Sequence, residues 1–114
     1  MRIAVIGSRS ITGIDLKNYL PENTKLIISG GAKGMDQIAK DYAKTNRIAL
    51  LEILPDYAKY QRRAPLIRNL EIIKKADKVI AFWDGKSKGT KFVIDNCAKA
   101  KVECEVIQCQ YQIR

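Results

Sequence analysis

The chain has 114 residues and a formal net charge of +9, with 21 Lys and Arg against 12 Asp and Glu. This length suits one domain with one hydrophobic core. Hydrophobic residues make up 46% of the chain and charged residues 29%, which excludes the intrinsically disordered class. We therefore expect a single globular domain over residues 1–114.

Neither a targeting segment nor a metal site is expected. The apolar run at residues 3–6 is too short for a signal peptide or a membrane span, which predicts a cytoplasmic protein without membrane attachment. The cysteines Cys97, Cys104 and Cys109 form no Cys-x-x-Cys pair, and the chain has no histidine. We expect reduced thiols and no bound metal.

The basic charge indicates a polyanionic partner, either a nucleotide or a nucleic acid. Lysines spread over solvated helix faces would give the same net charge. The charge alone therefore does not choose between a ligand-binding surface and an ordinary basic surface.

In chain order, the first expected element is a strand over residues 2–7, an Ile/Val-rich run that ends at Gly7. Such a run is typical of a parallel strand buried on both faces. A short helix is expected over residues 11–20, because apolar residues recur there at helical spacing before Pro21. A second strand is expected over residues 25–29.

A second helix is expected from Gly34 or Met35 to about residue 46, followed by a strand over residues 49–54. Residues 55–63 are polar, aromatic and basic, and we interpret them as an irregular connection. The remaining elements are expected in the order helix 65–75, strand 78–82, helix 90–101 and strand 103–107.

Strands that alternate with helices at these lengths predict an α/β fold. We expect a doubly wound, five-stranded parallel sheet with about four helices, arranged in three layers. In such sheets ligands bind beyond the carboxyl ends of the strands, where the strand order reverses. The loops that follow the first four strands are therefore where a site is expected.

Two of these loops are rich in glycine and lead directly into a helix. The first reads Ser29-Gly-Gly-Ala-Lys-Gly-Met-Asp36 and the second reads Trp83-Asp-Gly-Lys-Ser-Lys-Gly-Thr90. Neither matches the dinucleotide G-x-G-x-x-G pattern or the P-loop. Free amides at a helix start and the helix dipole nevertheless favour a phosphate, so the two loops predict an anion site.

Several side chains in these loops have two interpretations. Asp36 is either a partner of its own helix dipole or an acceptor for ribose hydroxyls. Trp83 either stacks on a base or packs at the rim. Lys86 or Lys88 would add charge beside a phosphate, and Thr90 would add a hydroxyl donor.

The loop after the first strand, Gly7-Ser8-Arg9-Ser10, offers a glycine for close approach, two hydroxyls and a guanidinium that can grip phosphate. Residues 56–69 place three arginines beside Tyr57 and Tyr60. Basic residues among aromatic ones suit a nucleotide or single-stranded nucleic acid. A solvated basic loop is the alternative.

Together, these motifs resemble the SLOG superfamily of Rossmann-like nucleotide-binding domains, and most closely its small YspA-like branch. The resemblance covers nearly the whole chain and is carried by Ile6-Gly-Ser-Arg9, Ser29 to Asp36, Pro55-Asp-Tyr57, Ala64-Pro-Leu-Ile-Arg-Asn69 and Ala81 to Thr90. It implies a Rossmann-like fold with a phosphate and ribose site. With two further loop residues, Gly34 and Trp83, the expected ligand-binding residues are Gly7, Ser8, Arg9, Ser29, Gly30, Gly31, Gly34, Asp36, Arg68, Asn69, Trp83, Gly85, Gly89 and Thr90.

Relatives in the superfamily include the LOG phosphoribohydrolases and the single-strand DNA loading DprA proteins. LOG enzymes carry Pro-Gly-Gly-x-Gly-Thr followed closely by a catalytic glutamate, whereas residues 91–93 here, Lys-Phe-Val, contain no acid. This departure disfavours hydrolysis. The remaining catalytic candidates are Asp36, Asp84 and Arg68, none of which the sequence marks as perturbed.

The leading expectation is a module that binds or senses a nucleotide or nucleotide-derived ligand, such as an ADP-ribose-like molecule, and requires no cofactor. The first alternative is a nucleotide N-glycoside hydrolase or transferase. The second is single-stranded nucleic acid binding of the DprA kind. The expected partner is thus a small phosphorylated ligand, with nucleic acid as the alternative, and the resemblance also implies a homodimer.

Overall fold

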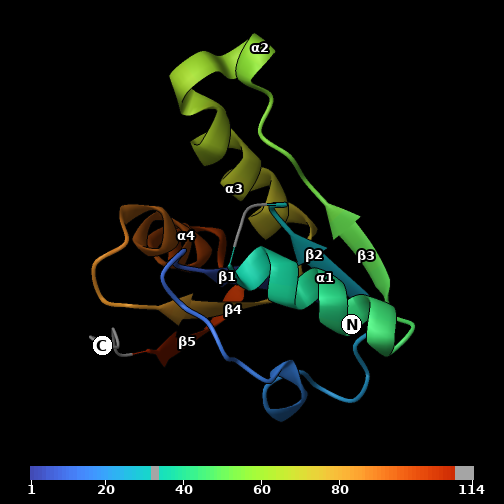
Figure 1. Cartoon of the computed structure of the whole chain (residues 1–114). Helices are drawn as coiled ribbons and strands as arrows, with labels where there is room; N and C mark the ends of the chain where they lie inside the picture. The colour runs from blue at the N-terminus through green and yellow to red at the C-terminus, as the bar shows by residue number, and fades with distance from the viewer. Residues whose placement is uncertain (32–33, 110–114) are drawn as a thin grey trace.

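A computed structural model of the chain describes residues 1–31 and 34–109. It has three layers, with a five-stranded parallel sheet between helices (Figure 1). The strands lie in the order β3-β2-β1-β4-β5, which confirms the predicted doubly wound α/β fold. The strand bounds are β1 (Arg2–Gly7), β2 (Leu26–Ser29), β3 (Ala49–Glu52), β4 (Lys78–Trp83) and β5 (Glu103–Gln108).

The helices cover both faces of the sheet. Their bounds are α1 (Met35–Thr45), α2 (Tyr57–Tyr60), α3 (Ala64–Lys75) and α4 (Lys88–Ala100), with short 3-10 turns η1 (Leu16–Asn18) and η2 (Gln61–Arg63). Residues of α1 and η1 pack on one face, whereas residues of α3 and α4 pack on the other. None of the helices in the described parts of the chain is sufficiently long and apolar to span a bilayer.

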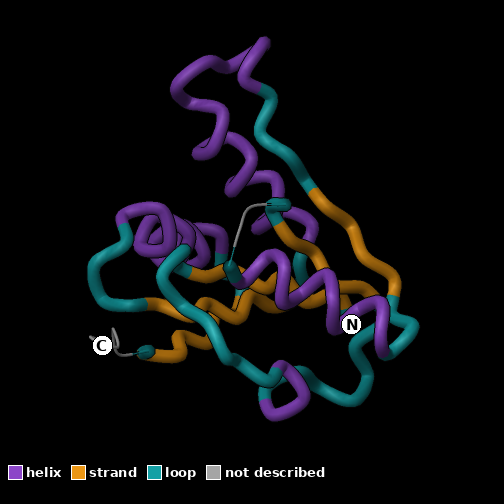
Figure 2. Tube along the Cα trace, in the orientation of Figure 1, coloured by secondary structure: helices purple, strands orange, loops and turns teal. Residues whose placement is uncertain are grey.

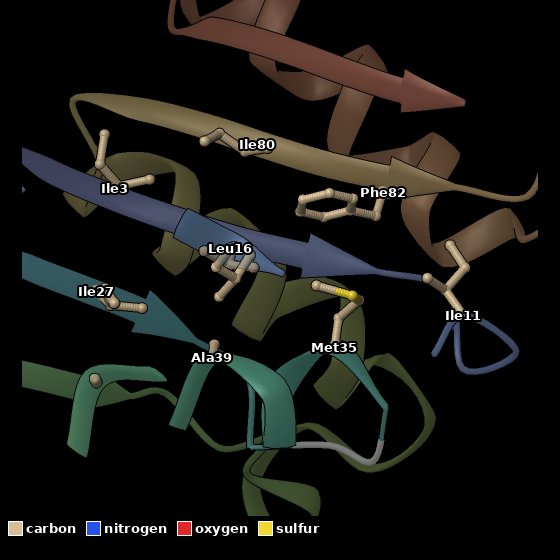
Figure 3. Close-up of a cluster of buried hydrophobic side chains, with 10 residues drawn as sticks. Ile3, Ile11, Leu16, Ile27, Met35, Ala39, Ile80 and Phe82 are labelled. Atoms are coloured by element: carbon tan, nitrogen blue, oxygen red, sulfur yellow. The ribbon is translucent and has the colours of Figure 1, made fainter. Parts of the chain in front are cut away.

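The core follows from the alternation of side chains along buried strands. In β1, Ile3 and Val5 belong to the cluster under α1, whereas Ala4 and Ile6 belong to the cluster under α3 and α4. The ring of Phe82 lies in the first cluster toward the carboxyl ends of the strands (Figure 3). Both faces of the central strands are therefore apolar, as parallel sheets require.

The helix predicted over residues 11–20 is wrong, because this connection is mostly loop with one 3-10 turn (Figure 2). Gly13 has a φ of +72°, outside the right-handed helical region, and the Asp15 carboxylate caps the short turn by accepting the Lys17 amide at 3.1 Å. Ile11 and Leu16 are nevertheless buried in the core. The apolar spacing that suggested a helix thus belongs to a loop packed on the sheet.

The segment 55–63, predicted to be irregular, instead contains α2 and η2. The Asp56 carboxylate accepts the Lys59 amide at 3.1 Å and so begins α2. Gln61 ends it with a φ of +54°. Figure 1 shows α2 at the end of α3 that points away from the sheet, so these residues project from the body of the domain.

The strand order decides where the loops separate. From β1 the chain moves outward through β2 to β3, and then crosses back to place β4 on the other side of β1. The connections that follow β1 and β4 therefore leave the sheet toward opposite faces. This opens a crevice beyond the carboxyl ends of these two strands, the usual ligand position in such folds.

Candidate functional site

A cavity of about 490 Å³ lies at this crevice, and we call it the central cavity. Its volume falls in the range of small-molecule sites. The loops after β1, β2 and β4 line it together with α3. Of the predicted site residues, those that line it are Gly7, Ser8, Arg9, Gly30, Asp36, Arg68, Asn69, Asp84, Gly89 and Thr90.

Five predicted residues do not line the central cavity. Gly31 lines an adjoining hollow, and Ser29 is fully buried. The Ser29 hydroxyl has no hydrogen-bond partner within residues 1–31 and 34–109. Gly34 caps α1 with a φ of +80°, which explains the glycine there. Ala32 and Lys33 of this loop lie outside the described residues.

The other two predicted residues shape the loop after β4. The Trp83 indole nitrogen donates a hydrogen bond to the Ser87 carbonyl at 3.1 Å, so this ring braces the loop. Gly85 has a φ of +80°, a conformation that other residues rarely adopt. Both positions shape this loop without lining the cavity.

Ser10, whose hydroxyl the sequence offered, also lines the cavity, and the structure adds lining residues that were not assigned to the site from the sequence: Ile6, Pro65, Leu66, Ile72 and Ser87. Ser87 had a sequence signal, because serine is a favoured residue directly before a helix and α4 begins at Lys88. The helix was expected to start at Thr90, so Ser87 was not recognised as the residue that caps it. Leu66 and Ile72 had none, since apolar residues on a helix usually indicate core.

Asp84 organises the loop that enters α4. Its Oδ1 atom accepts the amides of Lys86 and Ser87, each at 2.8 Å, and its Oδ2 atom accepts the Ser10 hydroxyl at 3.0 Å. These hydrogen bonds, led by the Ser87 and Lys86 amides, lower the pKa of Asp84 below its ordinary value. An ionised carboxylate held in this way is unsuited to act as a general acid at neutral pH.

A chain of hydroxyl groups joins the loops after β1 and β4. Ser8 Oγ accepts the Asp84 amide at 3.3 Å and lies 3.4 Å from Thr90 Oγ1. Thr90 Oγ1 donates to Ser87 Oγ at 3.3 Å, and Ser87 Oγ also accepts the Thr90 amide at 3.4 Å. All three hydroxyl residues line the central cavity. They present polar groups at the first turn of α4.

Arg68 links α3 to the loop after β2. Its Nη1 atom donates to the Gly30 carbonyl at 2.7 Å, and its Nε atom donates to Asn69 Oδ1 at 2.8 Å. Burial lowers the pKa of Arg68, with the nearby Asp36 and Tyr57 opposing this effect and Arg9 adding to it. A β-carbon at Gly30 would lie 3.0 Å from the Arg68 guanidinium carbon. Glycine at position 30 therefore lets the arginine approach the backbone.

Asp36 lies in the first turn of α1, and its Oδ1 atom accepts the Gly30 amide at 3.4 Å. The peptide groups of Gly30 are thus held by Asp36 on the amide side and by Arg68 on the carbonyl side. An ionised carboxylate only accepts hydrogen bonds, so the Asp36 side chain suits hydroxyl and amide donors. In the described part of the chain, no three His, Cys, Asp or Glu side chains are grouped to hold a metal ion.

No protein-family model, curated protein or solved structure compared with this chain matches it. The resemblance to the SLOG superfamily therefore depends on the sequence motifs and stays a prediction. The chemistry of the residues that line the central cavity therefore indicates its ligand.

Asp84→Ala is expected to loosen the loop before α4, because two backbone amides and one hydroxyl lose their acceptor. Hydrogen exchange at the Lys86 and Ser87 amides should become faster. Since the pKa of Asp84 is lowered on folding, its stabilising effect is present above the unfolded-state pKa and is lost as the pH falls through the folded-state value. NMR titration of the wild-type carboxyl group checks the direction, and an unshifted or raised pKa would contradict it.

Proposed function

We propose that the central cavity binds a nucleotide or nucleotide-derived ligand through its phosphate. The supporting observation is that the first turn of α4, the hydroxyls of Ser8 and Thr90, and the guanidinium of Arg68 meet at one hollow. Helix N-termini, hydroxyls and arginine side chains are all favoured partners of phosphate. The position at the switch point of the sheet supports the same class of ligand.

The phosphate is expected at α4 rather than at α1. The first turn of α4 contains no acidic residue, and a β-carbon at Gly89 would meet no atom within 4 Å. A phosphate can therefore approach the backbone there. The first turn of α1 contains Asp36, whose negative charge offsets the positive end of that helix dipole. The loop before α4 also contains a carboxylate, that of Asp84, but it already accepts the Lys86 and Ser87 amides and the Ser10 hydroxyl. The first turns of the two helices thus differ in the charge that they attract.

Asp36 is then expected beside the sugar. Its carboxylate repels a phosphate but accepts hydrogen bonds from ribose hydroxyls. Arg68 lies near Asp36 and donates a hydrogen bond to the Gly30 carbonyl, which places it beside the sugar position. This arrangement supports a ligand that contains both groups, rather than inorganic phosphate alone.

A calorimetric titration of the full chain tests the proposal. The panel is ribose 5-phosphate, the four ribonucleoside 5′-monophosphates and adenosine, which lacks the phosphate. The phosphorylated compounds should bind and raise the melting temperature, whereas adenosine should bind far more weakly. Absence of binding by every phosphorylated compound at millimolar concentration would overturn the proposal.

Gly89→Ala is expected to weaken phosphate binding without destabilising the fold. The added methyl group meets no protein atom within 4 Å, and alanine favours a helix over glycine by up to about 1 kcal/mol. The same methyl group would lie at the cavity wall, where it obstructs a bound phosphate. We expect a loss of affinity of roughly 5- to 150-fold, the equivalent of ordinary steric overpacking.

Gly13→Ala is the matched control for Gly89→Ala. A β-carbon at Gly13 also meets nothing within 4 Å, but the φ of +72° strains any residue other than glycine. This variant should lose about 1 kcal/mol of unfolding free energy and keep its ligand affinity. Equal affinities of the Gly89→Ala variant and the wild type would argue against phosphate at α4.

Hydrolysis is not proposed. Asp84 is engaged by the loop amides, and Asp36 holds the Gly30 amide. The hydrolase and nucleic-acid alternatives, the cytoplasmic location and the homodimer all stay predictions from the sequence.

A further inference from the structure

A second hollow of about 380 Å³ adjoins the central cavity, and we call it the side cavity. The two share four lining residues, and the side cavity extends toward the projecting segment that contains α2. Its lining residues are Arg9, Gly30, Gly31, Pro55, Tyr57, Pro65 and Arg68. A ligand held in the central cavity can therefore continue into this space.

The side cavity differs in chemistry from the central one. Among the described residues, its lining includes no serine, threonine or carboxylate, and instead combines the rings of Pro55, Tyr57 and Pro65 with two guanidinium groups. Flat apolar rings and guanidinium planes are the surfaces on which a nucleobase stacks. The lining thus suits a planar aromatic group better than a second phosphate alone.

Exposed large hydrophobic side chains gather in the chain segment that contributes Pro55, Tyr57 and Pro65 to the side cavity. Four of the seven large hydrophobic side chains exposed among the described residues fall between positions 54 and 66: Leu54, Tyr57, Tyr60 and Leu66. Tyr57 is 59% exposed although it lines a hollow. Concentrated exposed apolar surface beside a cavity indicates a binding site.

We propose that the side cavity is the nucleobase subsite and that Tyr57 stacks on the base. This inference rests on the proposed function. The ligand then lies with its phosphate at the first turn of α4, its ribose beside Asp36 and its base against Tyr57. Arg68 lines both cavities and stands at the junction between sugar and base.

The test compares two ligands that differ only by the base. The full chain is titrated with ribose 5-phosphate and with the tightest-binding ribonucleoside 5′-monophosphate. In the wild type, the nucleotide should bind roughly 5- to 150-fold more tightly, the range that stacking of one base supplies. Tyr57→Ala should bring this ratio toward one while leaving ribose 5-phosphate affinity unchanged. Tyr57→Phe should keep most of the ratio.

Tyr60→Ala is the matched control, because Tyr60 is the other tyrosine of α2 and lines neither cavity. It should retain the wild-type ratio. A wild-type ratio near one, or an unchanged ratio in Tyr57→Ala, overturns the base subsite while the proposed phosphate site stands. Failure of both ligands to bind the wild type overturns the proposed function and this inference with it.

Discussion

Arg68→Met is expected to weaken nucleotide binding by roughly 30-fold to several thousand-fold, the cost of truncating one partner of a buried charged contact. Arg68 holds the Gly30 carbonyl at 2.7 Å and Asn69 Oδ1 at 2.8 Å, and it lines both cavities. Its removal takes away the cation that faces the ligand and also frees the loop after β2. Calorimetric titration with a ribonucleoside 5′-monophosphate measures the loss.

Arg62→Met is the control for charge, because Arg62 is exposed in η2 and lines neither cavity. Both variants lower the net charge by one. If binding depended only on the overall basic charge, the two variants would lose affinity equally. An Arg68→Met variant that binds within threefold of the wild type would contradict the assigned position of the ligand.

Phe82→Ala should lower the free energy of unfolding by about 3–5 kcal/mol. Phe82 is fully buried in β4, and its ring meets the Tyr19 ring edge-on at a centroid distance of 5.1 Å. Truncation removes that contact and leaves a void beside Met35 (Figure 3). Such a loss is a large part of the stability of a domain of this size. Urea unfolding followed by circular dichroism measures it.

Leu70→Ala is the control for the core variant, since Leu70 is a large apolar residue left exposed on α3. It should change the unfolding free energy by no more than about 0.5 kcal/mol. A comparable loss in both variants would indicate that Leu70 is covered in solution. A loss of less than 1 kcal/mol in Phe82→Ala would contradict the packing of this core cluster.

The central strands β1 and β4 were predictable because burial on both faces requires a continuous run of apolar residues. Residues 2–7 form β1 with the predicted bounds, and the helix predicted from Pro65 begins one residue earlier, at Ala64. Hydrophobic spacing failed over residues 11–20 because a loop packed on the sheet must bury apolar side chains as a helix does. It also missed α2, whose four residues include none that are buried.

The candidate site was partly predictable for a different reason. Glycines at the end of a strand or the start of a helix indicate turns and close approaches whatever their partners are, so Gly7, Gly30 and Gly89 could be assigned from the sequence. The side chains that contact these glycines could not be assigned from the sequence. Arg68 is separated from Gly30 by 38 positions in the chain, and only the crossing from β3 to β4 brings α3 beside the loop after β2.

The sequence by itself determined the α/β class, the alternation of elements and the presence of two glycine loops that enter helices. These features follow from local rules of burial, helix termini and glycine conformation. Only the tertiary structure decided that the Asp84 carboxylate is committed to its own loop, and that Tyr57 lines a hollow beside Arg68. The physical reason is that charge and stacking act through space, between groups that the strand order brings together.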